Sequence, residues 1–217
     1  MILALLVCTL DLALNGGPPR KAPEVQTIVL HHTTLPTMGN SIRVLRLRGM
    51  SYHYLIDDTG AVVNAVPFTR TAYHAAGAND TSVGIAFTGG MDTTWEPTPK
   101  QRAAAKALIT TLVRQHPGIR YLIGHGDVRD INAGEPYGVS FDQLLAELEA
   151  ESSIKLLHPH NDEQPLAAYR ELALERLANP RTVRTPSRRR RRPAYEAVTC
   201  RSGKRTSRVR YPVTLGR

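Results

Sequence analysis

Short apolar runs alternate with turn-forming segments between residues 25 and 151. Each run is bounded by polar or glycine residues and is too short for a typical helix, so each predicts a strand with a buried face. The runs are Thr27–Leu30, Tyr52–Ile56, Ala61–Val66, Val83–Phe87 and Tyr121–Ile123. Asp57-Asp58-Thr59-Gly60 lies between the second and third runs and predicts a hairpin turn, because Gly60 tolerates the positive φ that such a turn needs.

Two segments combine helical spacing with a capping signal. Thr98 is followed by a proline and then by Gln101, which predicts an N-cap, proline at the first helical position and a capping box. Ser140 and Gln143 repeat the box before a second run of apolar residues at helical spacing. Ser41–Leu47 could form a short helix, although its interleaved arginines leave a strand open.

Strands and helices in this order predict an α/β fold, with a single domain that has a central mixed β-sheet flanked by α-helices. We place this domain at residues 23–151, after an N-terminal extension at residues 1–22. Residues 152–179 predict a linker and a short helix, the helix lying near Leu166–Leu177. The last segment, residues 180–217, is expected to be a basic disordered tail.

The net charge of +9 belongs to the tail and not to the folded body. Residues 180–217 hold thirteen lysines or arginines and one glutamate, so this segment carries +12 and the remainder of the chain −3. Arg188–Arg192 is a low-complexity run that predicts a solvated segment. The functional alternative is attraction to anionic envelope polymers or to nucleic acid, which salt would weaken.

The cysteines and the apolar N-terminus say little about the function of the protein. Cys8 and Cys200 lie in opposite terminal segments and show neither metal-binding spacing nor a disulfide framework. The apolar stretch Met1–Leu14 is too short to span a membrane, so no transmembrane segment is expected. It lacks a basic start and is therefore a poor signal sequence, and the alternative is an element packed on the domain.

Candidate chemistry lies where two of the apolar runs end. His31 and His125 each follow an apolar run, and Glu135 follows His125 after ten residues. A single histidine at a strand end is more often structural than a ligand. Two imidazoles at strand ends together with one carboxylate can form an open zinc site, whose fourth position is left for water.

At this point the sequence resembles the type-2 N-acetylmuramoyl-L-alanine amidases, which include phage lysozyme-amidases and peptidoglycan recognition proteins. The resemblance rests on five motifs that occur in the family's order between Val25 and Glu151. The motifs are Leu30–Thr33, Ser51–Asp57, Tyr73–Ala75, Asn79–Ile85 and Gly124–Val128. It implies the same α/β fold and a zinc-dependent hydrolase.

The family's site residues carry over by position. His31, and not the adjacent His32, matches the first zinc ligand, and His125 matches the second. The third ligand in the family is a cysteine or aspartate directly before a proline, and here Glu135 takes that position with a longer arm. Tyr52 matches a tyrosine beside the zinc-bound water and is the expected catalytic residue.

Several neighbouring residues have weaker assignments. His74 and Asn79 are expected to line the groove for glycan and peptide, with loop packing as the alternative. Asp127 and Asp130 are the other carboxylates that could bind metal, although Asp127 is expected to fix its loop. His53 is expected to be structural, because in an alternating strand it faces away from the preceding tyrosine.

Two positions depart from the family pattern. At the position of Ala133, many members carry a lysine or threonine that can stabilise the oxyanion. At the position of Ala86, some members carry a glutamate. Losing one oxyanion donor typically lowers the rate by about 10²–10³. Arg129 or Asn132 could take over that role.

The resemblance implies hydrolysis of the amide between N-acetylmuramic acid and L-alanine in peptidoglycan, with Zn²⁺ as cofactor. Such a protein would be an endolysin or a wall-remodelling enzyme, acting as a monomer at the peptidoglycan layer. Two alternatives remain: a catalytically impaired peptidoglycan-binding module, and a protein that acts on nucleic acid through its tail. His158 and His160 are expected to lie in a solvated linker.

Overall fold

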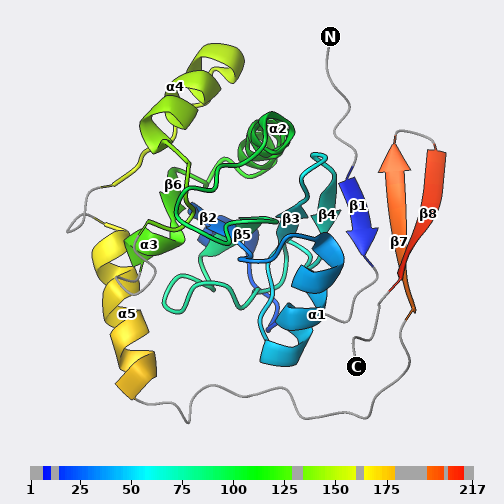
Figure 1. Cartoon of the computed structure of the whole chain (residues 1–217). Helices are drawn as coiled ribbons and strands as arrows, with labels where there is room; N and C mark the ends of the chain where they lie inside the picture. The colour runs from blue at the N-terminus through cyan, green and yellow to red at the C-terminus, as the bar shows by residue number, and fades with distance from the viewer. Residues whose placement is uncertain are drawn as a thin grey trace.

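The computed structural model describes residues 7–10, 15–128, 134–159, 164–178, 195–202 and 205–212. Its centre is a mixed sheet in the strand order β6-β2-β5-β3-β4-β1-β7-β8 (Figure 1). The strands are β1 (Val7–Leu10), β2 (Thr27–His32), β3 (Tyr54–Ile56), β4 (Val62–Asn64), β5 (Ser82–Phe87), β6 (Tyr121–Gly124), β7 (Tyr195–Ser202) and β8 (Arg205–Pro212). A short 3₁₀ helix, η1 (Ala22–Glu24), precedes β2.

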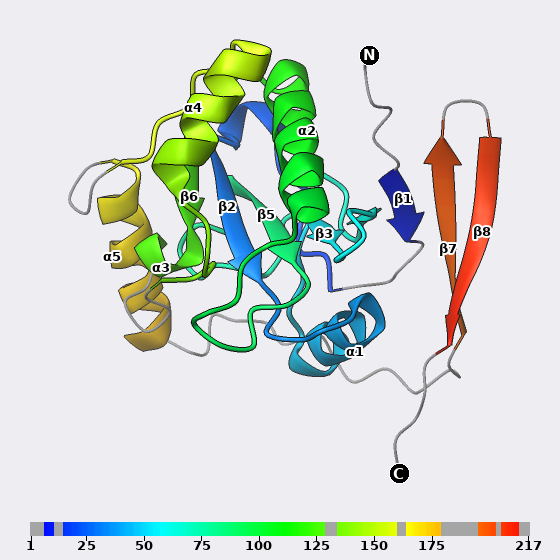
Figure 2. The same ribbon diagram turned by 45° about the horizontal axis from the view of Figure 1, so that its top comes forward.

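Four neighbouring strands run parallel at one end of the sheet, in the order β6, β2, β5 and β3. β2 pairs in parallel with both β5 and β6, and β3 pairs in parallel with β5. β2 and β5 therefore end at the same edge (Figure 2). The register places Leu30 opposite Gly124, so that His31 and His125 follow at the same edge of the sheet. Every residue of β2 and β5 is buried, as expected for parallel strands covered on both faces.

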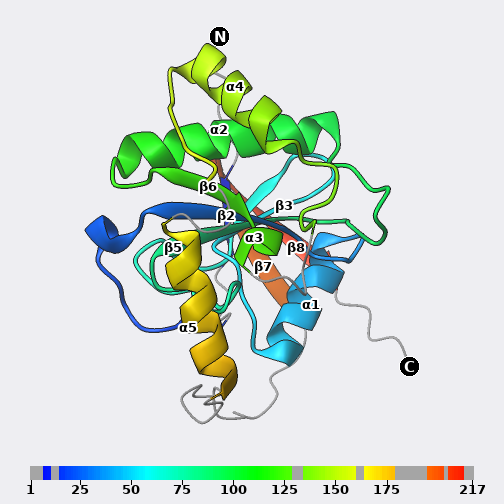
Figure 3. The same cartoon turned by 90° about the vertical axis from the view of Figure 1, so that its left-hand side faces the viewer.

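Helices cover both faces of the sheet. α2 (Pro99–Gln115) and α4 (Phe141–Ser152) lie on one face, and α1 (Met38–Arg48) and α5 (Leu166–Ala178) lie on the other (Figure 3). A single turn, α3 (His125–Val128), follows β6 directly. The α/β fold predicted from the sequence is confirmed. No helix among the described residues combines the length and the apolar character that a membrane span requires.

The capping signals place two helix starts correctly. Thr98 Oγ1 accepts a hydrogen bond from Gln101 N, and the Gln101 side chain accepts one from Thr98 N, which closes the expected box. Ser140 accepts a hydrogen bond from Gln143 N at the start of α4. The second box does not close, because the Gln143 amide donates to Glu147 instead.

The ambiguous segment at Ser41–Leu47 is helical. α1 begins earlier than expected, after Thr37, whose side chain accepts a hydrogen bond from Asn40 N. It ends at Gly49, whose φ of 69° is the left-handed conformation that glycine adopts without strain. The buried residues follow helical spacing and are Met38, Ser41, Ile42 and Leu45. The interleaved arginines therefore mark the outward side of a helix.

The hairpin predicted at Asp57–Gly60 is confirmed. β3 and β4 pair antiparallel on either side of it. Asp57 Oδ1 accepts hydrogen bonds from Thr59 N and Ala61 N, and Gly60 has a φ of 83°.

The terminal segments contribute strands to the sheet. β1 pairs in parallel with β4 and antiparallel with β7, and β7 and β8 form an antiparallel hairpin. Residues 195–202 and 205–212, which lie within the tail that was expected to be disordered, form these strands, and their threonine, valine and tyrosine residues favour extended backbone. Arg188–Arg192 lies outside the described residues. The register sets Cys8 opposite Cys200.

Candidate metal centre

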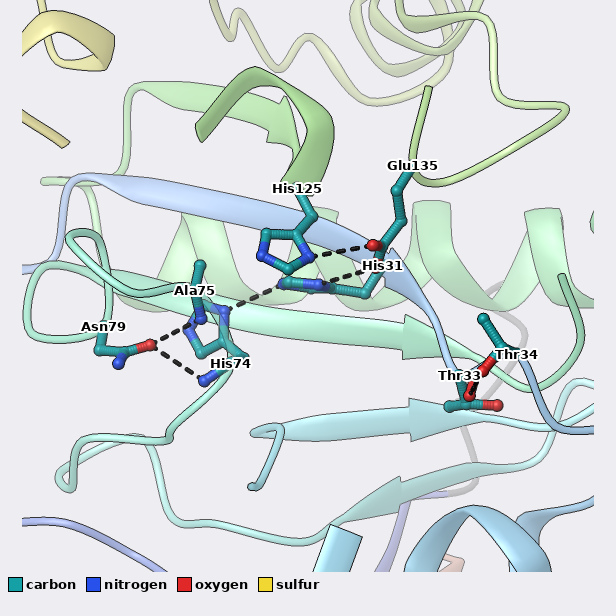
Figure 4. A network of polar contacts seen from close by, with 8 residues as sticks. All are labelled: His31, Thr33, Thr34, His74, Ala75, Asn79, His125 and Glu135. Atoms are coloured by element: carbon teal, nitrogen blue, oxygen red, sulfur yellow. Dashed lines mark hydrogen bonds and ion pairs between the residues drawn. The ribbon is translucent and has the colours of Figure 1, made fainter. Parts of the chain in front are cut away.

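Two histidines and one glutamate converge at the edge where β2 and β6 end (Figure 4). His31 Nδ1 lies 3.3 Å from Glu135 Oε1, and His125 Nδ1 lies 3.0 Å from Glu135 Oε2. The three potential ligand atoms lie within 4.8 Å of one another. The three residues proposed as zinc ligands are thus brought together with one nitrogen of each ring facing the carboxylate.

Glycine lets the loop that carries Glu135 approach the end of β6. A Cβ atom at Gly124 would lie 2.6 Å from the Glu135 carbonyl oxygen, which is closer than packed atoms allow. Gly126 N donates a hydrogen bond of 3.0 Å to the same oxygen. The Glu135 backbone is therefore fixed against the start of α3, and its side chain spans the distance to both imidazoles.

The electrostatics of the group suit a cation. Burial, with the nearby His125, lowers the pKa of His31 to about 4 against the opposing effect of the Glu135 carboxylate. Burial alone would raise the pKa of Glu135, but the hydrogen bonds and positive charges that His125 and His31 offer in their protonated forms outweigh it and hold this pKa well below its ordinary value. At neutral pH the group therefore combines a neutral His31 and an anionic Glu135.

This donor set fits zinc. Zn²⁺ takes imidazole nitrogen and carboxylate oxygen as ligands, and three protein ligands leave a further position open. His31 is fully buried, while the Glu135 side chain keeps 15 % of its surface exposed. The group is thus held from the protein side and can be reached from the solvent side.

His32 takes no part in this group. Its ring lies 4.6 Å from the Tyr137 ring and 6.0 Å from the Trp95 ring, between centroids. It is 5 % exposed, and neither ring nitrogen has a hydrogen-bond partner among the described residues. Successive residues of a strand face opposite sides of the sheet, which supports His31 as the ligand of the two.

Tyr52 lies beside the group. Its ring centroid is 4.9 Å from that of His31, and the residue is 5 % exposed. Burial, and then the charge of Glu135, raise the pKa of the Tyr52 hydroxyl well above its ordinary value. The hydroxyl therefore keeps its proton at neutral pH and is available as a hydrogen-bond donor.

His74 and Asn79 occupy a different place from the groove lining that was expected. His74 is 3 % exposed and lies on the side of the His31 ring that faces away from Glu135, with its Nδ1 3.0 Å from His31 Nε2 (Figure 4). Asn79 is 7 % exposed, and its Oδ1 accepts hydrogen bonds from His74 N and Ala75 N. Both residues therefore lie inside the protein, and the contacts of Asn79 match loop packing, the alternative that the sequence left open. Sequence reasoning missed the contact between His74 and His31.

The structural role expected for His53 matches its contacts. His53 is fully buried, its Nδ1 accepts a hydrogen bond from Gly84 N, and its Nε2 lies 3.0 Å from Arg70 O. Burial, and then the charge of Arg20, lower the pKa of His53 to about 3. The ring therefore ties the segment before β3 to β5 as a neutral group.

Asp127 fixes the loop after β6, as expected. Its Oδ2 accepts a hydrogen bond of 2.6 Å from Gly124 N and lies 3.0 Å from His158 Nε2. The solvated position expected for His158 is wrong, because its ring also stacks on Phe141 with centroids 4.5 Å apart. The other candidates near the site lie outside the described residues; they are Arg129, Asp130, Asn132, Ala133 and His160.

Known proteins are similar to this chain in sequence and in fold. A peptidoglycan-recognition protein of Drosophila simulans is 28% identical over 151 residues, which cover 57% of this chain and 83% of that protein. The endolysin of Klebsiella phage KP32 is 31% identical over 120 residues, which cover 50% of this chain and 79% of that protein. The structure of the endolysin N-acetylmuramoyl-L-alanine amidase LysCS from Clostridium intestinale superposes with a TM-score of 0.58 at 26% identity, covering 66% of this chain and 95% of that chain.

The sequence profile of the N-acetylmuramoyl-L-alanine amidases matches residues 20–136. This range is more than half of the 217-residue chain and includes His31, His125 and Glu135. The chain therefore belongs to the N-acetylmuramoyl-L-alanine amidase family.

Proposed function

We propose that this protein is a zinc-dependent amidase that hydrolyses the bond between N-acetylmuramic acid and L-alanine in peptidoglycan. Membership of the family supports a role in peptidoglycan cleavage or peptidoglycan binding. The observation that carries the catalytic proposal is the convergence of His31 Nδ1, His125 Nδ1 and the Glu135 carboxylate. A module that only binds glycan and peptide has no need of these three groups at one point.

His31, His125 and Glu135 would hold the zinc ion. When bound, zinc supplies a Lewis acid that polarises a carbonyl and lowers the pKa of a coordinated water. The depressed pKa of Glu135 suits an anionic ligand and makes its carboxyl group a poor proton donor. Its negative charge also offsets part of the charge of the cation.

Tyr52 is the residue of this chain that we assign to the reaction itself. As a protonated phenol beside His31, it can donate a hydrogen bond to the oxygen that becomes negative when the lactyl carbonyl is attacked. Its raised pKa excludes a role as a general base near neutral pH. Because this chain has alanine at positions 86 and 133, stabilisation of the oxyanion depends more on Tyr52 here than in relatives with further polar groups.

The alternative function is a peptidoglycan-binding module with impaired turnover. One observation favours it: Ala86, which stands in β5 opposite His31 in the register, offers only a methyl group where some relatives carry glutamate. Replacement of the family's cysteine or aspartate by Glu135 points in the same direction. An amidase and a binding module would both bind peptidoglycan, but they would differ in zinc content and in turnover.

Release of free amino termini from purified murein separates the two functions. We expect the wild-type protein to contain one zinc ion per chain, to release amino termini, to lose activity with a chelator and to regain it with added zinc. His31→Ala should abolish both zinc binding and release. Murein binding without release, by a protein that takes up no zinc, would refute the catalytic proposal and support the binding module.

The remaining predictions about partners concern the tail and the assembly state. Contact of the arginine-rich segment with anionic envelope polymers or nucleic acid stays a prediction, as does a monomeric state. If the arginine-rich segment only adds electrostatic attraction, replacing Arg188–Arg192 by serines, which leaves β7 and β8 in the chain, should leave cleavage of soluble murein fragments intact. The same replacement should reduce binding to whole sacculi at low salt and have little effect at high salt.

A further inference from the structure

A buried line of polar groups connects the metal group to the interior of the domain. His31 Nε2 lies 3.0 Å from His74 Nδ1, and His74 Nε2 lies 3.3 Å from Ser82 Oγ. Ser82 Oγ in turn lies 2.6 Å from the carbonyl oxygen of Ala78. His31 and Ser82 are fully buried and His74 is 3 % exposed. We call these four residues the buried relay.

The direction of each hydrogen bond in the buried relay follows from its inner end. The Ala78 carbonyl can only accept, so the single proton of the Ser82 hydroxyl is used there. The Ser82 oxygen must then accept from His74, which places the His74 proton on Nε2 and leaves a lone pair on Nδ1. That lone pair accepts from His31 Nε2–H. The lone pair of a neutral His31 therefore lies on Nδ1, the nitrogen that faces Glu135 and His125.

The backbone around His74 is built to hold its ring in this place. A Cβ atom at Gly84, in the middle of the buried strand β5, would lie 2.6 Å from His74 Cγ. Glycine within a strand usually weakens it and often marks a close approach by another group. Asn79 Oδ1 accepts hydrogen bonds from the backbone N–H of His74 and of Ala75. Two independent features thus fix the ring against His31.

We propose that His74 is a positioning residue for the metal centre: it holds His31 in the Nε2–H tautomer, so that Nδ1 is presented to the metal ion. This inference rests on the proposed zinc function and assigns a residue that acts through a ligand, without touching the substrate. Metal-binding histidines generally donate their second N–H to a fixed acceptor, which orients the ring and raises its basicity. A neutral imidazole fills the acceptor role here.

The asparagine and glutamine variants of His74 form a matched pair. Asparagine places an amide oxygen near the position of Nδ1 and can still accept from His31. Glutamine reaches the position of Nε2 and can contact Ser82, but it leaves His31 without its acceptor. Zinc affinity is measured by competition with a chromophoric chelator, and thermal unfolding of the metal-free proteins is recorded for both variants and for wild type.

We expect His74→Gln to bind zinc about 10–100-fold more weakly than wild type, and His74→Asn to stay much closer to wild type. Equal losses in the two variants, no loss in either, or losses that only follow the drop in Tm would overturn the inference. His31→Ala identifies the site that is being measured. If wild type and His31→Ala bind zinc equally, the proposed function fails; if only His31→Ala loses zinc and His74→Gln does not, the role of His74 alone fails.

Discussion

The carbonyl oxygen of Glu135 packs so closely against Gly124 that the Cβ atom of any larger residue there would lie only 2.6 Å from this oxygen. Gly124 ends the strand that precedes His125, so this contact joins the segments carrying two of the proposed ligands. The neighbouring Gly126 N holds the same oxygen at 3.0 Å. The spacing between His125 and Glu135 is thus set by backbone contacts and not by their side chains alone.

Gly124→Ala should therefore separate the two ligands. The added methyl group forces the Glu135 backbone outward, and such overpacking typically costs about 1–3 kcal/mol of folding free energy. We expect weaker zinc binding and reduced murein cleavage, measured by chelator competition and by release of amino termini. Gly39→Ala in α1 is the control, since its Cβ meets nothing within 4 Å, and it should keep wild-type zinc affinity.

The role of Glu135 as a zinc ligand can be tested by changing the length and the charge of its side chain. Glu135→Gln keeps the arm and removes the charge, and Glu135→Asp keeps the charge and shortens the arm. Because the backbone is fixed by Gly126, we expect the shorter aspartate to reach the histidines poorly, so that both variants bind zinc more weakly than wild type. Metal analysis of proteins purified side by side measures this. Full zinc occupancy in both would remove Glu135 from the ligand set.

The sequence was sufficient for the parts of this fold that local patterns determine. The apolar runs predicted the central strands, and Thr98 with Gln101 predicted the start of α2, because strand burial and helix capping depend on nearby residues. The ends of two such runs also identified His31 and His125 as a pair. The strands β7 and β8 were missed because an arginine-rich composition outweighs a short alternating pattern.

The role of His74 could not be read from the sequence, for a physical reason. Its partners are His31, Ser82 and the Asn79 amide, and their meeting depends on how the segment before β5 folds back under β2. The one local indication is Gly84, because a glycine inside a buried strand often marks the close approach of another group, here the His74 ring. Glu135 needed the family resemblance as well, because no periodicity marks a ligand in a loop.

Tyr52→Phe tests the donor that we assign to the reaction. Removing the hydroxyl leaves the ring in place beside His31, so zinc content and folding stability should stay close to wild type. Because Ala86 provides no alternative polar group in β5, we expect the rate of murein cleavage to fall by about 10²–10³, the usual effect of losing one oxyanion donor. An unchanged rate would show that another group stabilises the oxyanion.

Acid should destabilise the metal-free protein, with His53 contributing in a defined pH range. Its pKa is lowered from 6.5 to about 3, so the unfolded chain binds a proton as the pH falls through 6.5 while the folded chain does not. The free energy of unfolding should therefore be highest above pH 6.5 and decrease toward pH 3, by at most about 1.4 kcal/mol per pH unit for this one group. Urea denaturation at pH 7, 6 and 5, with a chelator present, measures the slope, because pH 7 lies above that range and pH 6 and 5 lie inside it.

His53→Asn isolates this contribution from those of the other buried histidines. The asparagine oxygen can still accept the hydrogen bond from Gly84 N, but the side chain does not titrate. We expect the variant to be less stable than wild type at pH 7, because the contact with Arg70 O is lost, and to lose less stability on going to pH 5. Parallel curves for the two proteins would mean that His53 titrates alike in both states, and that the acid sensitivity arises at His31 and His74, which are buried with lowered pKa values as well.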